Sequence, residues 1–270
     1  MKLQLFQNLK NRIHQIVTTF KLNLTHKNNP QGRPLKIDNE NALTLALYQH
    51  ASTRATKKSL YDDLKDLLNC SYKTLVVAIN RASILAMKIL AIFMQIGKKH
   101  GHLVKYTDET DIPVCLKKNA DSHRVMKAFA AIARSSKGWF YGLKMTMTRD
   151  ASGTILGIRF TSPNKNDRDI FRSLNKDIDG IIVADAGYVS KELEKDMNSE
   201  GKRWVLIQPY KRMKKLALDW QLKLYRSRFR IEFDFRSLKL FYGLITSLPR
   251  SVNGYLANYI NAICSFVLSK

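Results

Sequence analysis

The sequence is poor in cysteine, glycine, proline and acidic residues, and each shortage limits what the protein can be. Its three cysteines, Cys70, Cys115 and Cys264, are far apart and form no Cys-x-x-Cys pair, which argues against a disulfide framework and a cysteine-rich zinc site. With 12 Gly and 6 Pro, the chain is not of low complexity. It has no glycine-rich nucleotide loop and no signal peptide, so we expect a reducing, cytoplasmic location.

The shortage of acids gives the chain a large positive charge. There are 22 Asp and Glu against 46 Lys and Arg, a formal net charge of +24. Such an excess attracts a polyanion, either nucleic acid or an anionic membrane surface. The longest apolar run, residues 82–97, contains Lys88 and is shorter than the roughly 20 residues that a membrane span needs. We therefore predict a buried helix there.

The N-terminal part of the chain is basic and then helical in pattern. The first 37 residues contain seven Lys or Arg and no acid, and they include Gly-Arg-Pro around Arg33. An Arg on an extended arm can enter a narrow minor groove of DNA, although a turn before the next helix is the favoured interpretation. Apolar residues recur at helical spacing from Asp38 to His100. A helix-turn-helix is possible there, but any small helical bundle gives the same pattern. We predict an all-α N-terminal domain over residues 1–102.

From residue 103 to 270 the pattern alternates between strands and helices. The expected strands are 103–107, 139–148, 154–161, 180–184 and 203–208. The expected helices are 167–174, 190–198, 216–242 and 253–268. This order predicts an α/β layer fold with a mixed sheet.

Two acidic residues follow predicted strands of this second domain. Asp108 and Asp185 each come directly after a strand, at the edge where α/β sheets commonly bind ligands. Gly187 permits a tight turn after Asp185, and Ser190 can cap the next helix. An Asp in this position can also be a simple turn former. The pair alone therefore does not decide between a site and two turns.

A third acidic residue lies among cations on the predicted late helix. At about 100° per residue, Tyr225, Arg228, Glu232 and Lys239 share an arc of about 60°, and Arg236 extends this stripe. A neighbouring apolar stripe is expected to anchor the helix to the core; it consists of Leu222, Phe229, Phe233 and Leu240. A carboxylate among cations suits contact with a metal ion and a DNA phosphate together. A solvated helix with Glu232 as an ion-pair partner is the alternative.

The spacing Tyr225-x2-Arg228-x3-Glu232-x6-Lys239 resembles the signature of bacterial insertion-sequence transposases with a DDE triad and an RNase H-like fold. The segment that begins at Asp185 is similar to the second-Asp motif of these proteins, and Asp108, four residues before Ile112, resembles their first Asp. Glu109 and Asp111 are nearby acids; we choose Asp108 because the predicted strand ends there. The resemblance covers residues 103–270 and implies an RNase H-like catalytic domain.

The resemblance implies a transposase that cleaves and joins DNA at the ends of its insertion sequence. Asp108, Asp185 and Glu232 would be the catalytic residues and the ligands of two divalent ions, Mg²⁺ or Mn²⁺, which suit an oxygen-rich site. Tyr225, Arg228, Arg236, Lys239 and Arg33 would contact DNA.

The implied partners are the terminal inverted repeats and target DNA, bound by a homodimer or higher oligomer in the bacterial cytoplasm, with no membrane. A decayed or repurposed transposase that only binds DNA is the alternative function. A third possibility is a basic protein that binds RNA or a membrane surface. The sequence contains neither an RNA-recognition motif nor a long basic amphipathic helix with an aromatic face, which argues against it.

Overall fold

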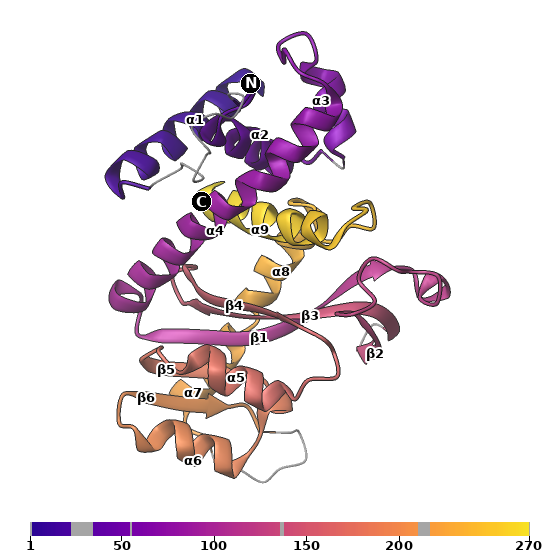
Figure 1. Ribbon diagram of the computed structural model, residues 1–270. Helices are drawn as coiled ribbons and strands as arrows, with labels where there is room; N and C mark the ends of the chain where they lie inside the picture. The colour runs from indigo at the N-terminus through magenta and orange to yellow at the C-terminus, as the bar shows by residue number, and fades with distance from the viewer. Residues whose placement is uncertain (1, 23–34, 55, 136–137, 210–216, 270) are drawn as a thin grey trace. The chain divides into compact units, whose positions relative to one another are not determined.

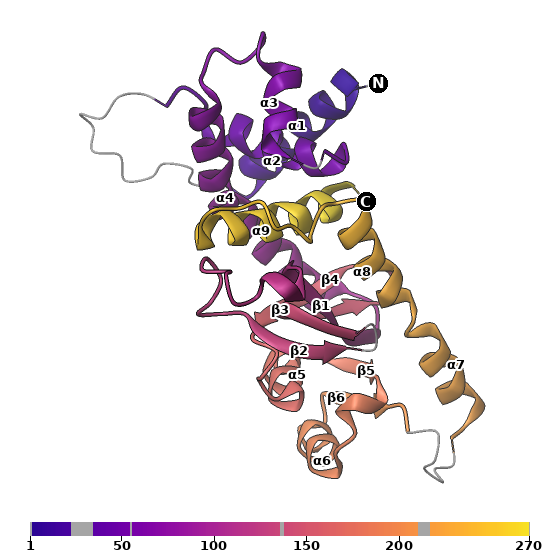
Figure 2. The same ribbon diagram turned by 90° about the vertical axis from the view of Figure 1, so that its right-hand side faces the viewer.

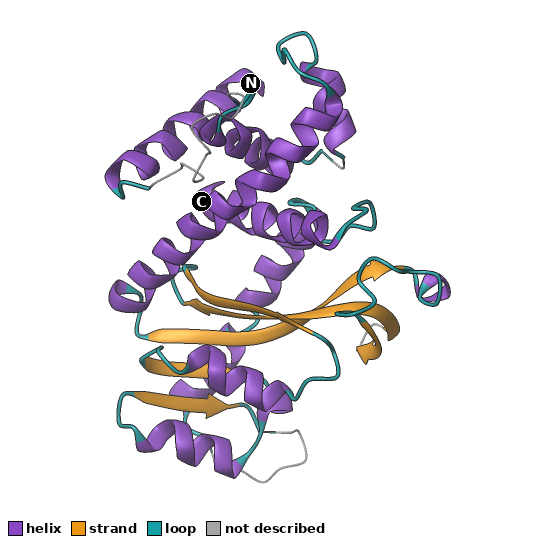
Figure 3. Ribbon diagram, in the orientation of Figure 1, coloured by secondary structure: helices purple, strands orange, loops and turns teal. Residues whose placement is uncertain are grey.

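The computed structural model describes the whole chain except residues 1, 23–34, 55, 136–137, 210–216 and 270 (Figure 1). The chain forms two compact units. A helical unit contains Met1–Ala91 and Ser237–Lys270, and an α/β unit contains Ile92–Arg236. Figure 3 shows that strands occur in the second unit and helices in both. The helical and α/β classes predicted for the two parts of the chain are thus confirmed.

The helical unit is assembled from both ends of the chain. From the N-terminal part come α1 (Lys2–Thr19), α2 (Asn39–Ala51), α3 (Lys57–Leu64) and most of α4 (Tyr72–His100); from the C-terminal part comes α9 (Val252–Ser269). Helix α2 packs against both α1 and α9, and the Ser265 hydroxyl donates to the Leu47 carbonyl over 3.0 Å. The predicted boundary at residue 102 differs from this division, because α9 completes a core with α2.

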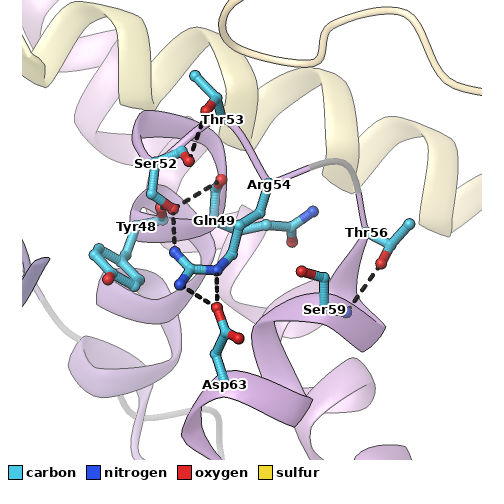
Figure 4. Close-up of polar contacts among 8 residues, drawn as sticks. All are labelled: Tyr48, Gln49, Ser52, Thr53, Arg54, Thr56, Ser59 and Asp63. Carbon is cyan, nitrogen blue, oxygen red and sulfur yellow. Dashed lines mark hydrogen bonds and ion pairs between the residues drawn. The ribbon is translucent and has the colours of Figure 1, made fainter.

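The sequence explains where these helices begin. Asp38 caps α2 by accepting a hydrogen bond from the Asn41 amide at 2.8 Å, and Thr56 caps α3 by accepting from the Ser59 amide at 2.9 Å. Arg54 joins the end of α2 to α3, as Figure 4 shows: its guanidinium donates to Asp63 and lies over the Tyr48 ring, 5.0 Å from the centroid. The helix-turn-helix hypothesis for α3 and α4 stays a prediction.

The apolar run at residues 82–97 belongs to α4, which is only partly buried. Ile79, Ala86 and Ile89 are buried, whereas Val77 and Met87 are exposed. By length and composition α4 could cross a membrane, a test that the core helices of globular proteins also pass. The prediction of a buried helix therefore holds for one face of α4.

The α/β unit is built on a mixed sheet with the order β2-β3-β1-β5-β6, in which β4 also pairs with β3. Its strands are β1 (Val104–Cys115), β2 (Ala131–Ser135), β3 (Gly138–Asp150), β4 (Ile155–Thr161), β5 (Gly180–Ala184) and β6 (Arg203–Ile207). Strand β1 pairs antiparallel with β3 and parallel with β5, and β5 pairs parallel with β6. As the sequence predicts, the sheet is mixed, with both parallel and antiparallel strand pairs.

Helices cover both faces of this sheet (Figure 2). On one face α5 (Asp167–Asn175) and α6 (Lys191–Ser199) contribute to a buried cluster that includes Phe171, Leu193 and Val205. On the other lie α7 (Asp219–Ser227) and the start of α8 (Arg230–Leu240). Alternate residues of β1 face the two layers. The Tyr106 hydroxyl lies 2.8 Å from Ser227 Oγ beside α7, and the Thr107 hydroxyl donates to Asn175 of α5 over 3.2 Å.

The structure differs from the sequence prediction in three places. Strand β1 runs past Asp108 to Cys115, because its antiparallel pairing with β3 continues after its parallel pairing with β5 has ended. Strand β2, on the outer edge of β3, was not predicted. The helix expected over residues 216–242 is interrupted at Arg228 and Phe229, where i→i+3 hydrogen bonds such as Glu232 N to Phe229 O (3.0 Å) tighten the chain.

Candidate active site

Strands β1 and β5 place the two aspartates side by side. The last parallel pair between these strands is Thr107 with Ala184, and the next residue on each strand is Asp108 and Asp185. Asp185 Oδ1 accepts a hydrogen bond from the Ala186 amide at 2.7 Å and so caps the short helix η2 (Ala186–Tyr188). The parallel pairing therefore brings the two aspartates, which the sequence places after separate strands, to the same end of the sheet.

Arg228 gathers three carboxylates around one guanidinium. It lies in the interruption between α7 and α8, on the face of the sheet toward which Asp108 points. Its Nη1 is 2.5 Å from Asp108 Oδ2. Its Nη2 is 3.3 Å from Glu232 Oε1 and 4.0 Å from Asp185 Oδ1. Residues far apart in the sequence, which come from β1, the end of β5 and α8, thus converge on a single cation.

Burial differs sharply among the three acids. The Asp108 side chain is 13% exposed, whereas those of Asp185 and Glu232 are 49% and 58% exposed. Burial raises the pKa of Asp108 to about 6; the Arg228 charge opposes this shift, and the nearby Asp185 and Glu232 charges add to it. Burial therefore outweighs the ion pair. With one guanidinium for three carboxylates, the site carries excess negative charge at neutral pH.

The donor set of this cluster suits a hard divalent ion, because it consists of carboxylate oxygens. The carboxylates converge on Arg228, however, and no group of three His, Cys, Asp or Glu in the described part of the chain is already arranged to hold a metal ion. The residues fit Mg²⁺ or Mn²⁺ in their chemistry, while the position between them is occupied by a protein cation.

The neighbouring acid Glu109 points to the opposite face of β1. Its Oε1 lies 2.9 Å from Lys144 Nζ, and the same ammonium lies 2.9 Å from Asp167 on α5. Burial raises the pKa of Glu109, whereas the hydrogen bond from Lys144 lowers it. No sequence pattern points to Lys144 or Asp167, because they approach Glu109 only across the sheet and from a separate helix. This geometry favours Asp108 over Glu109 as the partner of Asp185 and Glu232.

A buried ion pair fixes α8 against the sheet. Arg149 Nη1 on β3 lies 2.6 Å from Asp234 Oδ2 on α8, and the two side chains are 8% and 10% exposed. Arg149 also donates through Nε to the Asp150 carbonyl at 3.0 Å. Since Asp234 is two residues from Glu232, this pair sets where Glu232 lies relative to β1. Sequence reasoning missed it because the partners are distant along the chain.

A family model described as "Transposase DDE domain" matches residues 97–251, which is more than half of the chain. The chain belongs to the DDE transposase family. Among curated proteins, no sequence matches it.

Solved structures similar to the transposase include complexes of Mos1. The Mos1 mariner paired-end complex with Mn is 14% identical and has a TM-score of 0.26, with 96% of this chain and 86% of that chain covered. The Mos1 paired-end complex with the left transposon end is 13% identical, with a TM-score of 0.26 and coverage of 93% and 84%. The pre-cleavage Mos1 transpososome has a TM-score of 0.25 and 13% identity, also with coverage of 93% and 84%. These likenesses are distant.

The remaining signature residues of the transposase lie in different surroundings. Tyr225 is buried, and its hydroxyl donates to the Ile207 carbonyl at 3.3 Å, so it anchors α7 to β6 and is not presented for stacking on DNA. Arg236 is exposed on α8. Lys239 follows on the same helix but belongs to the helical unit, and Arg33 lies outside the described residues.

The apolar stripe predicted to anchor this helix was wrong. Its four members are exposed: Leu222, Phe229, Phe233 and Leu240. The buried side chains are Ile231, Phe235 and Leu238, which have the i, i+4, i+7 spacing of a second stripe. Because the helix is interrupted at Arg228, α8 does not continue the direction of α7. The Arg149–Asp234 ion pair then holds α8 with this second stripe facing the interior. Phe229 and Phe233 instead form an exposed edge-to-face pair with centroids 5.3 Å apart.

Proposed function

We propose that the chain is a DNA transposase that cleaves and joins DNA at the ends of its insertion sequence. The observation that carries this proposal is the convergence of Asp108, Asp185 and Glu232 from three separate elements inside a DDE transposase domain. If Glu232 were only an ion-pair partner on a solvated helix, nothing would bring two strand-end aspartates to the same guanidinium.

The proposed roles follow from the geometry. Asp108 and Asp185 would hold divalent metal, and Glu232 would complete the ligand set. When bound, two such ions activate a water or a DNA 3′-hydroxyl and stabilise the leaving oxygen in displacement at phosphorus. Arg228 lies within reach of the same centre and would contact a phosphate beside the scissile bond. Pairing two element ends would require at least a dimer on DNA.

A cleavage assay tests this function. The purified chain is incubated with Mg²⁺ or Mn²⁺ and duplexes that carry the inverted repeats flanking its reading frame. Loss of an outer-shell partner of a metal already costs about 10- to 100-fold, so Glu232→Gln should cost at least that much in cleavage rate. Glu192→Gln is the matched control, because Glu192 is exposed in the first turn of α6.

The binding readout separates the enzyme from the DNA-binding alternative. Glu232→Gln should bind the end duplex at least as tightly as the wild type, because the change removes a negative charge. Full cleavage by Glu232→Gln would refute the site assignment. A wild-type chain that binds its ends but cleaves with neither metal would instead be the repurposed DNA-binding protein.

A further inference from the structure

Arg228 occupies the position from which a cation can reach all three carboxylates of the proposed active site. Its contacts to Asp108, Glu232 and Asp185 span 2.5 to 4.0 Å. A divalent ion that uses the same oxygens has to share this space with a guanidinium of like sign. The side chain is only 13% exposed, so solvent screens this competition little.

The guanidinium is nevertheless incompletely bound where it lies. Its Nε is buried and has no hydrogen-bond partner, and its contact to Asp185 is at the outer limit of an ion pair. A phosphate group offers such a donor fork a second arrangement, in which two of its oxygens accept two parallel hydrogen bonds. When DNA enters, hydrogen bonds to phosphate can therefore replace the contacts of Arg228 with the carboxylates.

We infer that Arg228 is the resident counter-cation of the triad, that divalent metal must displace it, and that DNA phosphate accepts it when it moves. Metal and DNA would then bind with positive coupling, since each favours the same displacement of one side chain. This inference rests on the proposed function, because it needs metal at the triad.

Binding of Mn²⁺ to the protein without DNA tests this inference, with free Mn²⁺ measured by electron paramagnetic resonance. Arg228→Gln should bind Mn²⁺ at least about fivefold more tightly than the wild type, the lower end of usual coupling between sites. The matched control is Arg226→Gln, which removes the same charge from an exposed position on α7. Arg228→Lys should give an intermediate value, because one ammonium reaches fewer of the carboxylates.

The same titration with a short end duplex measures the coupling. DNA should tighten Mn²⁺ binding to the wild type and to Arg226→Gln, and it should have a smaller effect on Arg228→Gln. Equal or weaker Mn²⁺ binding by Arg228→Gln without DNA, with its thermal unfolding unchanged, overturns the inference. If Glu232→Gln binds Mn²⁺ as well as the wild type does, the proposed metal site itself fails, which is a distinguishable result.

A second observation concerns the end of the β1–β3 ribbon that lies beyond the triad. The described segment 116–135 contains Lys117, Lys118, Arg124, Lys127 and Arg134 against Asp121 alone. Exposed apolar side chains lie among these cations: Leu116, Phe129, Ile132 and Trp139. Lys117 Nζ lies over the Trp139 ring, 5.1 Å from its centroid. Basic side chains beside exposed aromatic rings are typical of nucleic-acid surfaces.

We propose that this ribbon end, defined by Lys117, Lys118, Arg134 and Trp139, binds the end duplex, which is the DNA substrate of the proposed function. Seven residues of β1 separate Asp108 from Leu116, and the eight steps between them, at about 3.3 Å each, span at most about 26 Å. Duplex DNA rises about 3.4 Å per base pair, so the contact would fall within about eight base pairs of the cleaved bond.

Salt-dependent binding to an end duplex tests this surface. Lys117→Ala/Lys118→Ala should lower the slope of log affinity against log salt by about 1 to 2. The control Lys191→Ala/Lys195→Ala removes the same charge from exposed positions on α6 and should leave the slope unchanged. The fluorescence change caused by DNA should be smaller in Trp139→Phe than in the wild type. An unchanged slope in Lys117→Ala/Lys118→Ala overturns this proposal. Mn²⁺ binding by the same variant should equal that of the wild type, which shows that the triad is intact.

Discussion

Removing one partner of the Arg149–Asp234 pair should destabilise the α/β unit strongly. Both side chains are about nine-tenths buried, at 8% and 10% exposed, and their charged atoms lie 2.6 Å apart. Asp234→Leu leaves the Arg149 charge buried without this carboxylate, which costs about 3–5 kcal/mol. Since domains of this size lose about 2–4 °C in Tm per kcal/mol, the unit should melt roughly 10 °C lower.

The double variant Arg149→Met/Asp234→Leu distinguishes a buried charge from simple loss of packing. Replacement of a whole buried pair by apolar side chains is often nearly neutral, so the double variant should recover most of the loss. Calorimetry or circular dichroism on Asp234→Leu, on the second single variant Arg149→Met and on the double variant measures this. If the double variant loses as much as the two single variants together, the pair is not coupled and the reasoning is refuted. Cleavage by the recovered double variant then reports how far the pair positions Glu232.

Two further outcomes concern stability. Burial lowers the pKa of His50 to about 4, against a hydrogen bond with the Tyr242 carbonyl that raises it. Its neutral form therefore stabilises the fold above pH 6.5, and up to about 3 kcal/mol is lost as the pH falls from 6.5 toward 4. Urea unfolding should show a weaker pH dependence for His50→Gln than for the wild type, and equal dependence would contradict this. In Gly142→Ala, the new Cβ would lie 2.1 Å from the Ile112 carbonyl oxygen, so a loss of about 1–3 kcal/mol is expected. Gly187→Ala, where a Cβ meets nothing within 4 Å, should show no such loss.

The features that sequence predicts well here are local. The strand Gly180–Ala184 is a short buried apolar run between turn signals, and its predicted limits are those of β5. Helix α6 begins after Ser190 as expected, because that hydroxyl accepts a hydrogen bond from the Leu193 amide at 3.3 Å. Asp185 follows β5 directly, so its place at the sheet edge could be derived from that strand alone.

The features that sequence misses depend on contacts between distant segments. Residues 216–242 contain two apolar stripes, and only the packing of α8 through Asp234 on Arg149 decides which is buried. Arg228 shares the predicted stripe with Glu232. Its contact with Asp108, however, joins residues 120 positions apart in the sequence, so no local pattern shows it. The strand pattern could not show that β1 continues beyond Asp108, because that extension depends on β3 alone.

The division of the chain into two units decides which unit can fold first during synthesis. The α/β unit is an insertion within the helical unit, because Ile92–Arg236 separates Met1–Ala91 from Ser237–Lys270. During translation, α2 emerges before the α/β unit, whereas α9, against which it packs, is made after it. The α/β unit can fold while the helical unit still lacks its final helix. A nascent chain can thus assemble the triad before its helical core is closed, and it exposes the apolar face of α2 until α9 arrives.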